Sequence, residues 1–178
     1  RVLPGKIVEE LPHNDRIIGG IDEESTKKTI EFYSRFVTGA LLPTDARTAE
    51  MAKLTENSFR DVNIAFANEL SIICDKLGID VWELIRLANR HPRVNILQPG
   101  PGVGGHCIAV DPWFIVDSAP RDARLIRVAR EVNDSKPHVV MEKVYEAVRT
   151  TENPKVACLG LAFKPDIDDL RESPSLRI

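Results

Sequence analysis

One stretch of the chain combines a dense cluster of glycines with residues that could do chemistry. The sequence Pro-Gly-Pro-Gly-Val-Gly-Gly-His-Cys occupies residues 99–107, and Asp111 follows four residues after Cys107. Such a density of glycine destabilises a helix or strand. It is favourable where the backbone must come close to another group or take a positive φ. The spacing predicts a loop that presents a thiol, with Asp111 on the same face of a following helical turn.

Cys107 also has a structural interpretation, because a free cysteine is most often a small buried apolar residue. The glycine-rich flank and the nearby Asp111 favour a reactive thiol. A zinc site is disfavoured, since His106 and Cys107 are adjacent and no Cys-x-x-Cys pair accompanies them. We therefore predict no metal at this place.

Two further pairs of residues could contribute charge or hydrogen bonds. Lys53 and Asn57 lie four residues apart in a predicted helix, so they share a face on which a charged lysine could stabilise an oxyanion. Lys164 and Arg171 follow a predicted buried strand, where open α/β sheets bind ligands and cations suit phosphates. For each cation the alternative is an ordinary solvated surface charge.

Apolar periodicity and capping residues define the elements that must position these side chains. They predict strands at 16–20 and 40–42 around a helix at 23–37, a long helix at 46–77 ended by Gly78, helices at 80–89, from 111 and at 121–150, and a buried strand at 155–162. Asp22 caps the first helix, and Thr44 or Asp45 caps the long one. Pro137 is expected to kink or split the helix that contains it.

The long helix is predicted to bury one apolar stripe. The residues of this stripe recur at helical spacing: Met51, Leu54, Val62, Phe66, Leu70 and Ile73. Ser173 followed by Pro174 announces one more helix at the end of the sequence.

Composition excludes several classes of function. The 178 residues carry a net charge of -3, which offers no basic surface for nucleic acid or for a membrane. No apolar run approaches the roughly 20 residues that span a bilayer, and no stretch predicts a signal peptide. Three widely spaced cysteines favour a reducing, cytoplasmic setting over a disulfide framework. Because the sequence lacks an initiator methionine and ends within an expected helix, we expect a piece of a longer polypeptide.

Three blocks of sequence together resemble the UDP-glucose/GDP-mannose dehydrogenase family. They are AEMAKLTENSF at 49–59, GVGGHC at 102–107, and GLAFKP with DDLRESP at 160–174. Within the family, further stretches are most similar to members that act on UDP-N-acetyl-D-mannosamine: residues 63–70, 83–101 and 108–114.

The resemblance implies a mainly α fold with a central helical domain. Residues 1–44 would end an N-terminal NAD-binding Rossmann domain, 45–150 would form a central dimerisation domain built on the long helix, and 151–178 would begin a C-terminal UDP-binding Rossmann-like domain. No Gly-x-Gly-x-x-Gly follows a predicted strand, so the NAD site is expected before Arg1, and the chain alone is not expected to turn over.

The chemistry implied by the resemblance is a four-electron oxidation of a sugar C6 alcohol to a carboxylate with two NAD. Cys107 would capture the aldehyde as a thiohemiacetal, which becomes a thioester and is hydrolysed. Lys53 would stabilise the oxyanion, Asn57 would position water or that oxyanion, and Asp111 would assist proton transfer.

The resemblance also implies residues that bind the UDP-sugar. Lys164 would contact the UDP, Gly104 and Gly105 would line the sugar site, and Arg93 would reach the substrate of a neighbouring subunit in a homodimer formed through the long helix. No role follows for His106.

Three alternatives stay open. The substrate could be another UDP-sugar, such as UDP-N-acetylglucosamine or UDP-glucose. A 6-phosphogluconate or β-hydroxyacid dehydrogenase also has a long helix with Lys and Asn four residues apart, but it needs one hydride transfer and no cysteine. Finally, the chain could be a helical dimerisation module without catalytic function.

Overall fold

A computed structural model describes residues 5–178, which fall into two units divided between Lys53 and Leu54. Helices dominate, as the sequence predicts. The first four residues of the stretch assigned to an N-terminal domain, 1–44, lie outside the described residues. Among the described residues, no helix combines the length and apolar character needed to cross a membrane.

The first unit is a strand–helix–strand arrangement preceded by a short helix, α1 (Ile7–His13). Strand β1 (Arg16–Gly20) pairs in parallel with β2 (Leu41–Asp45), and α2 (Glu23–Tyr33) connects them. The predicted cap is present, because Asp22 accepts a hydrogen bond of 2.7 Å from the Ser25 backbone. The helix ends at Tyr33 rather than near Val37, and the chain continues as a turn.

Helix α3 (Ala46–Leu77) has the predicted bounds, and physical signals at both ends explain them. At its start, Asp45 Oδ1 accepts a hydrogen bond of 3.0 Å from the Thr48 backbone, so Asp45 rather than Thr44 is the cap. At its end, Gly78 takes φ +68°, a conformation that side chains disfavour.

The predicted buried stripe of α3 is wrong, because three of its six residues are exposed and none of the six is fully buried. Phe66 and Ile73 are 51% and 45% exposed, and Met51 is 47% exposed. The buried positions carry small or polar side chains instead: Asn57, Ser58, Asp61, Ala65 and Asn68. Hydrophobicity alone therefore predicts the wrong residues of α3 to be buried. Hydrogen bonds from polar residues of α3 to the rest of the chain decide which positions are buried.

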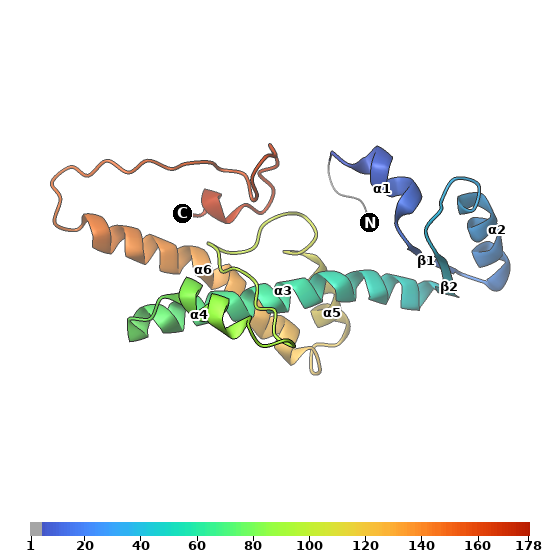
Figure 1. Cartoon of the computed structure of the whole chain (residues 1–178), viewed down its shortest axis with the longest axis horizontal. Helices are drawn as coiled ribbons and strands as arrows, with labels where there is room; N and C mark the ends of the chain where they lie inside the picture. Colours follow the sequence, from blue (N-terminus) through green and yellow to red (C-terminus); the bar gives the residue numbers. More distant parts are fainter. Residues whose placement is uncertain (1–4) are drawn as a thin grey trace. The chain divides into compact units, whose positions relative to one another are not determined.

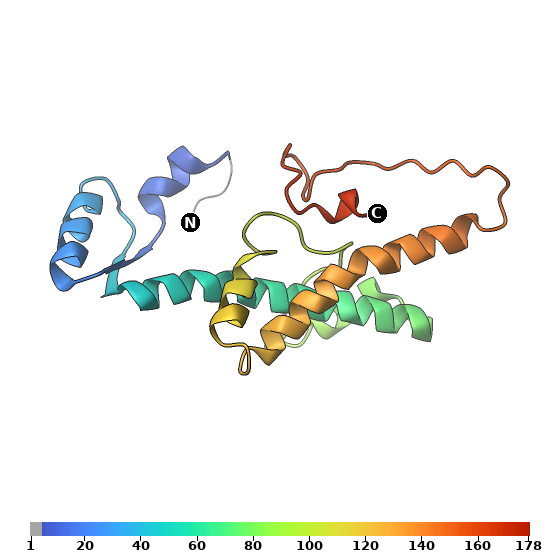
Figure 2. The ribbon, with the colours of Figure 1, turned by 180° about the vertical axis from the view of Figure 1, so that it is seen from behind.

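The second unit contains α3 from Leu54 onward and three further helices. They are α4 (Val81–Ala88), α5 (Asp111–Ser118) and α6 (Arg124–Val148). Both ribbon views show α6 crossing α3 (Figures 1 and 2). The expectation that Pro137 splits its helix is wrong, since α6 runs through it without interruption.

A buried polar network fastens α6 to α3. Arg130 Nη1 donates to Asp61 Oδ1 at 2.7 Å, and Asn133 Nδ2 donates to the same oxygen at 2.8 Å. Asn68 Nδ2 donates to Asn133 Oδ1 at 2.9 Å, while Asn68 Oδ1 accepts a bond of 2.8 Å from the Gly100 backbone. Burial raises the pKa of Asp61, although Arg130 opposes this. The charged carboxylate therefore depends on its partners.

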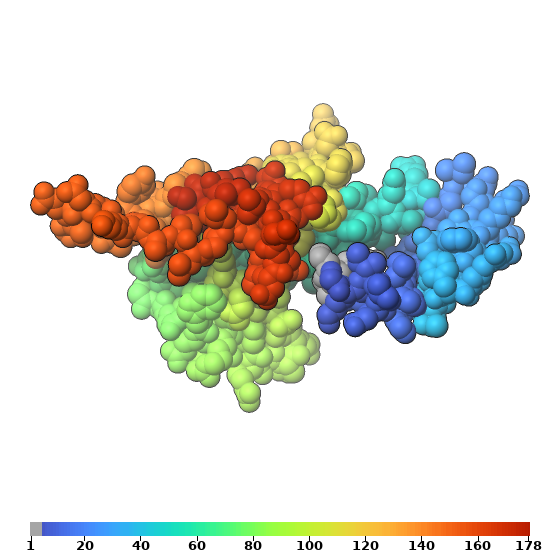
Figure 3. Space-filling model, turned by 90° about the horizontal axis from the view of Figure 1, so that it is seen from above, coloured from blue at the N-terminus to red at the C-terminus, as the bar shows by residue number. Residues whose placement is uncertain are grey.

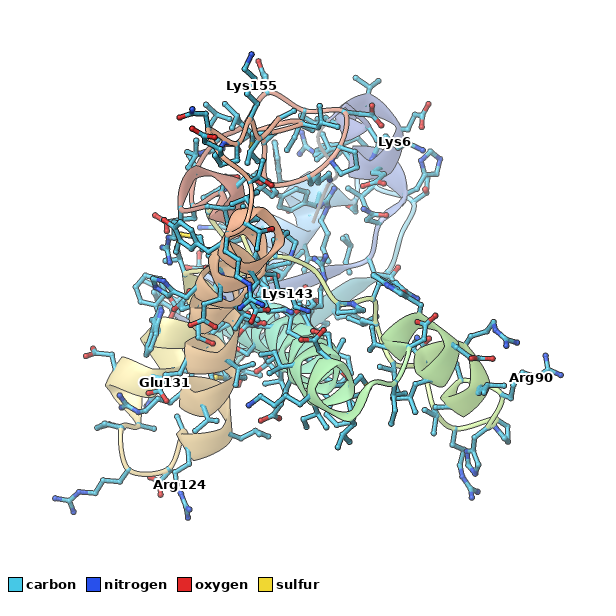
Figure 4. The ribbon with its side chains drawn as sticks, turned by 90° about the vertical axis from the view of Figure 1, so that its left-hand side faces the viewer. Lys6, Arg90, Arg124, Glu131, Lys143 and Lys155 are labelled. Carbon is cyan, nitrogen blue, oxygen red and sulfur yellow. The ribbon has the colours of Figure 1, made fainter. Side chains whose placement is uncertain are left out.

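A second ion pair joins the same two helices further along. Lys143 of α6, labelled in Figure 4, pairs with Asp75 of α3. Both side chains are about half exposed, so this pair contributes little compared with the buried network.

The strand predicted at 155–162 is wrong. These residues are extended but form no strand, and Leu159 is 94% exposed. A strand exists only where its backbone groups pair with a neighbouring strand, and none of the described residues pairs with this stretch. The helix announced by Ser173 and Pro174 is a single 3-10 turn, η1 (Pro174–Leu176).

We predict that Arg130→Leu lowers the free energy of unfolding by about 3–5 kcal/mol, because it leaves the Asp61 carboxylate buried without its cation. Urea denaturation of the chain measures this change. Arg124→Leu, on the exposed start of the same helix, should change stability by less than about 0.5 kcal/mol. A loss below about 1 kcal/mol in the Arg130 variant would contradict the assignment of the network as the main fastening.

Candidate functional site

The glycine loop, residues 99–105, packs against the C-terminal segment, residues 161–178. Gly105 donates its backbone N–H to the Arg171 carbonyl at 3.0 Å. A Cβ added at Gly104 would lie 2.5 Å from Phe163 Cβ and 2.7 Å from the Glu172 carbonyl oxygen. The space-filling view shows the C-terminal segment, in red, against the yellow residues of the loop (Figure 3). No side chain fits at Gly104.

Two of the loop glycines also take backbone conformations that L residues avoid. Gly102 has φ +137° and Gly105 has φ +89°. A Cβ at Gly102 would lie 3.2 Å from the Asn133 carbonyl oxygen, which has lost its helical donor because Pro137 has no N–H. The predicted close approach of backbone is thus present, and its partners here are α6 and the C-terminal segment.

Cys107 sits on the turn that leads from the glycine loop into α5. Residues 106–110 form this turn, and the Asp111 backbone donates to the Cys107 carbonyl at 2.8 Å. The helix itself begins at Asp111, one turn later than a start at the cysteine would give. Cys107 is half-buried, whereas Cys74 is buried and Cys158 is exposed. Cys107 is therefore partly covered by neighbouring residues and partly exposed to solvent.

Asn57 and Asp111, two of the predicted site residues, are brought together by the fold. Asn57 Nδ2 donates to Asp111 Oδ2 at 2.5 Å, which ties α3 to the first residue of α5. Asn57 is only 2% exposed. This contact holds the Asp111 carboxylate in a fixed place one helical turn after Cys107.

Asp169 and Arg171 form a second polar group beside the thiol turn, and the prediction did not include Asp169. Arg171 Nε donates to Asp169 Oδ1 at 2.9 Å, and Nη2 donates to Oδ2 at 2.6 Å. His106 Nδ1 lies 3.9 Å from Asp169 Oδ2. Hydrogen bonds from Arg171 lower the pKa of Asp169 to about 2. The Asp-x-Arg spacing could have signalled this pair.

The remaining predicted residues come from other parts of the chain. Lys53 is an exposed residue of α3 within the first unit, and Lys164 is exposed directly after Phe163, which contacts the glycine loop. Arg93 lies on the exposed stretch that follows α4. Figure 4 shows Arg90, at the start of this stretch, projecting away from the helices.

The described residues do not fit the phosphates of a dinucleotide. Among the described residues, β1 is the one strand that ends in glycines and is followed by a helix. The Asp22 carboxylate already caps that helix, α2. Glu23 and Glu24 add negative charge to the first turn, which repels phosphate. The described residues also contain no group of three or more side chains placed to hold a metal ion.

Residues 47–135, half of the chain, match the UDP-glucose/GDP-mannose dehydrogenase family, central domain. The chain belongs to this family. It is 67% identical over 178 residues to an NDP-N-acetyl-D-galactosaminuronic acid dehydrogenase of Ralstonia nicotianae, of which it covers 42%. It is also 67% identical, over all of its length, to a UDP-N-acetyl-D-mannosamine dehydrogenase of Campylobacter jejuni, of which it covers 44%.

A solved structure gives the same picture. The UDP-N-acetyl-mannosamine dehydrogenase of S. aureus matches 99% of this chain with 54% identity and a TM-score of 0.90, and the match covers 42% of that chain. The chain thus spans less than half the length of the relatives that it resembles.

We predict that Gly104→Ala loosens the C-terminal segment, because the new Cβ would overlap Phe163 and the Glu172 carbonyl. Limited proteolysis should cut within residues 161–173 about tenfold faster than in the unmodified chain. Gly100→Ala is the matched control, since its Cβ would meet no atom closer than 3.9 Å. Equal cleavage rates in the two variants would show that the loop does not seat the segment.

Proposed function

We propose that this chain is the central part of an NAD-dependent nucleotide-sugar 6-dehydrogenase that oxidises UDP-N-acetyl-D-mannosamine at C6 to the carboxylate. The observation that carries the proposal is the half-buried Cys107 on a turn whose continuation, Asp111, is held by Asn57 at 2.5 Å. The names of the Campylobacter and S. aureus relatives support the substrate. A cytoplasmic place in polysaccharide precursor synthesis would follow.

In the proposed reaction, Cys107 captures the aldehyde formed from the C6 alcohol. The thiolate sulfur adds to the carbonyl carbon, one C–S bond forms, and the carbonyl electron pair moves to oxygen as an oxyanion. Lys53, four residues before Asn57 on α3, is proposed to stabilise that oxyanion as a cation. Loss of a second hydride from the thiohemiacetal carbon, which NAD would accept when bound, would leave a thioester on the sulfur.

Asn57 and Asp111 are proposed to serve the hydrolysis of that thioester. Water adds to the thioester carbon and gives a proton to the Asp111 carboxylate, the C–S bond breaks, and Cys107 leaves as a thiolate. The hydrogen bond from Asn57 keeps the Asp111 carboxylate oriented for this proton transfer. The step balances as one carboxylic acid, the Cys107 thiolate and a protonated Asp111, whose proton can then return to the sulfur.

Substrate binding is proposed to involve the residues around the glycine loop. Lys164 would contact the UDP, because an exposed cation next to Phe163 suits a diphosphate. Gly104 and Gly105 would present backbone to the sugar, and Arg93 would act on the substrate of a partner subunit from its exposed stretch. When bound, NAD accepts hydride; since the described residues do not fit it, other parts of the polypeptide would hold it.

A second substrate has specific support. The Ralstonia relative, equal in identity to the Campylobacter one, is named for N-acetyl-D-galactosaminuronic acid. Both names describe a nucleotide-linked N-acetylhexosamine, so the acetamido group is the shared feature. Comparing the whole protein on UDP-N-acetylmannosamine, UDP-N-acetylgalactosamine, UDP-N-acetylglucosamine and UDP-glucose would rank these candidates.

We predict that Cys107→Ser in the whole protein reduces formation of the sugar acid by at least about 10³-fold, because the nucleophile that holds the aldehyde is lost. NADH release and the uronate product are measured together by absorbance and mass spectrometry. Cys158→Ser is the matched control and should keep full activity, since Cys158 is exposed outside the site. Undiminished acid formation by the Cys107 variant would contradict the capture of the aldehyde by this thiol, whereas a one-hydride dehydrogenase would form no acid from the C6 alcohol in either protein.

We also propose that the protein forms a homodimer through α3. The exposed face of α3 carries Phe59, Phe66 and Ile73, which are 68%, 51% and 45% exposed and recur every seven residues. Seven-residue spacing places side chains along one seam of a helix, and a second copy of the same helix is the natural cover for such a seam.

We predict that Phe66→Glu weakens this dimer at least about tenfold in sedimentation experiments on the whole protein, because it buries a charge in the seam. Leu125→Glu, at a more exposed apolar position near the start of α6, should leave the association constant unchanged. If the Phe66 variant sediments like the unmodified protein, the seam is not the contact.

A further inference from the structure

A cleft of about 550 Å³ lies in the second unit, between the end of α3, the start of α4 and the middle of α6. Residues 99–101, where the glycine loop begins, form another part of its wall. The volume is that of a site for a small organic molecule. Ser71, in this cleft, lies fourteen residues after Asn57 on α3, which is about 21 Å along the helix. The cleft is therefore separate from the thiol turn and has no role in the reaction described above.

Lys136 of α6 places a buried positive charge in the wall of this cleft. The residue is only 7% exposed, and its Nζ donates to Ser71 Oγ at 2.6 Å. Ser71 uses its own proton on the Asn68 carbonyl, so its hydroxyl accepts from the ammonium. An ammonium has three hydrogens to donate, and among residues 5–178 no carboxylate forms an ion pair with Lys136. A buried charge without a counter-ion is unfavourable for folding, so the need for stability does not explain this lysine.

The carboxylates of the cleft are engaged elsewhere. Asp75 pairs with Lys143, which Figure 4 labels. Asp80 Oδ1 accepts from the Trp82 backbone at 2.8 Å and so caps α4. Burial lowers the pKa of Lys136, and the charge of Lys143 adds to this, while Asp75 opposes it. The cleft thus combines two carboxylates that have partners with one buried ammonium that lacks an anion.

We propose that this cleft binds a small organic monocarboxylate, whose charged group pairs with Lys136 and whose apolar body lies against Trp82. The carboxylate oxygens would accept the ammonium hydrogens that Ser71 leaves unused and would offset the repulsion from Lys143. Trp82 is 56% exposed, and its indole offers an apolar surface for the body of such a ligand.

The charge balance of the cleft selects a carboxylate over a phosphate. One cation without a counter-ion suits a single negative charge, whereas Asp75 and Asp80 would repel a dianion. A bound carboxylate would also touch residues 99–101, from which the loop continues to Cys107. The proposal does not depend on the role given to that cysteine.

The test is binding of para-fluorobenzoate to the whole protein, followed by fluorine NMR, with UDP present at saturation to fill the nucleotide site. para-Fluorobenzamide carries the same ring without the charge, and it should bind at least about tenfold more weakly. Lys136→Met should weaken para-fluorobenzoate at least about fivefold and leave para-fluorobenzamide unchanged. Lys136→Arg keeps the charge and should stay within about twofold of the unmodified protein.

Two further variants locate the binding site. Trp82→Ala should weaken both probes at least about threefold, because it removes the apolar contact that they share. Lys155→Met removes an exposed lysine outside the cleft, labelled in Figure 4, and should change neither affinity.

Thermal unfolding separates loss of the site from loss of the fold. Because Lys136 is buried without a counter-ion, Lys136→Met should keep or raise the Tm of the protein without ligand. If that variant does not fold, the Arg variant and Trp82→Ala decide, since both leave the charge in the cleft.

Several results would overturn the proposal. They are equal affinity for para-fluorobenzoate and para-fluorobenzamide, binding of para-fluorobenzoate that survives Lys136→Met or Trp82→Ala, and tighter binding of para-fluorophenyl phosphate than of para-fluorobenzoate. Absence of binding by all of the probes, as when a second copy of the chain covers the cleft, would overturn it as well. None of these measurements needs turnover, so they can fail while the dehydrogenase assignment stands.

Discussion

The pairing of Asp61 with Arg130 in the interior is the interaction on which the second unit depends. Both side chains are essentially buried, and Asn133 donates to the same carboxylate oxygen. Removing a carboxylate and a guanidinium from water is expensive, so each is stable there only while the other remains as its partner. The helices α3 and α6 must therefore cross at one register, and through Asn68 and Gly100 that register also fixes where the glycine loop begins.

The site follows from this crossing. Once the loop starts at Gly100, the absence of side chains at Gly102 and Gly104 lets the backbone pass directly over α6 and under the C-terminal segment. The chain then turns into α5 with Cys107 half-buried and Asp111 tied to Asn57. The polar contacts made by Asn68 and Asn57, together with the missing side chains at Gly102 and Gly104, thus account for the position of the thiol.

Local signals could be read from the sequence, and contacts between distant residues could not. Asp45 and Gly78 gave the ends of α3 because caps act on their own helix. Residues 155–162 look like a strand, yet a strand requires a partner that no local pattern contains. Cys107 and Asp111 were recognisable by spacing, but the contact between Asn57 and Asp111 crosses 54 positions and needed the structure.

The inward face of α3 was missed for a related reason. Burial was assigned to large apolar residues such as Phe66, while the chain itself buries Asp61 and Asn68, whose partners lie on α6 and in the glycine loop. A stripe of Asn and Asp at helical spacing within a long helix was the available signal. It predicts pairing with another polar helix, which α6 supplies.

The docking of the C-terminal segment on the glycine loop has a consequence for biosynthesis. Residues 104–107 leave the ribosome well before Phe163 and Arg171, and chain growth proceeds at about 5–20 residues per second. For some seconds the nascent thiol turn therefore has no partner above it, and Cys107 takes on its mature surroundings only when the later segment arrives. Completion of the surroundings of Cys107 is thereby tied to the order of translation.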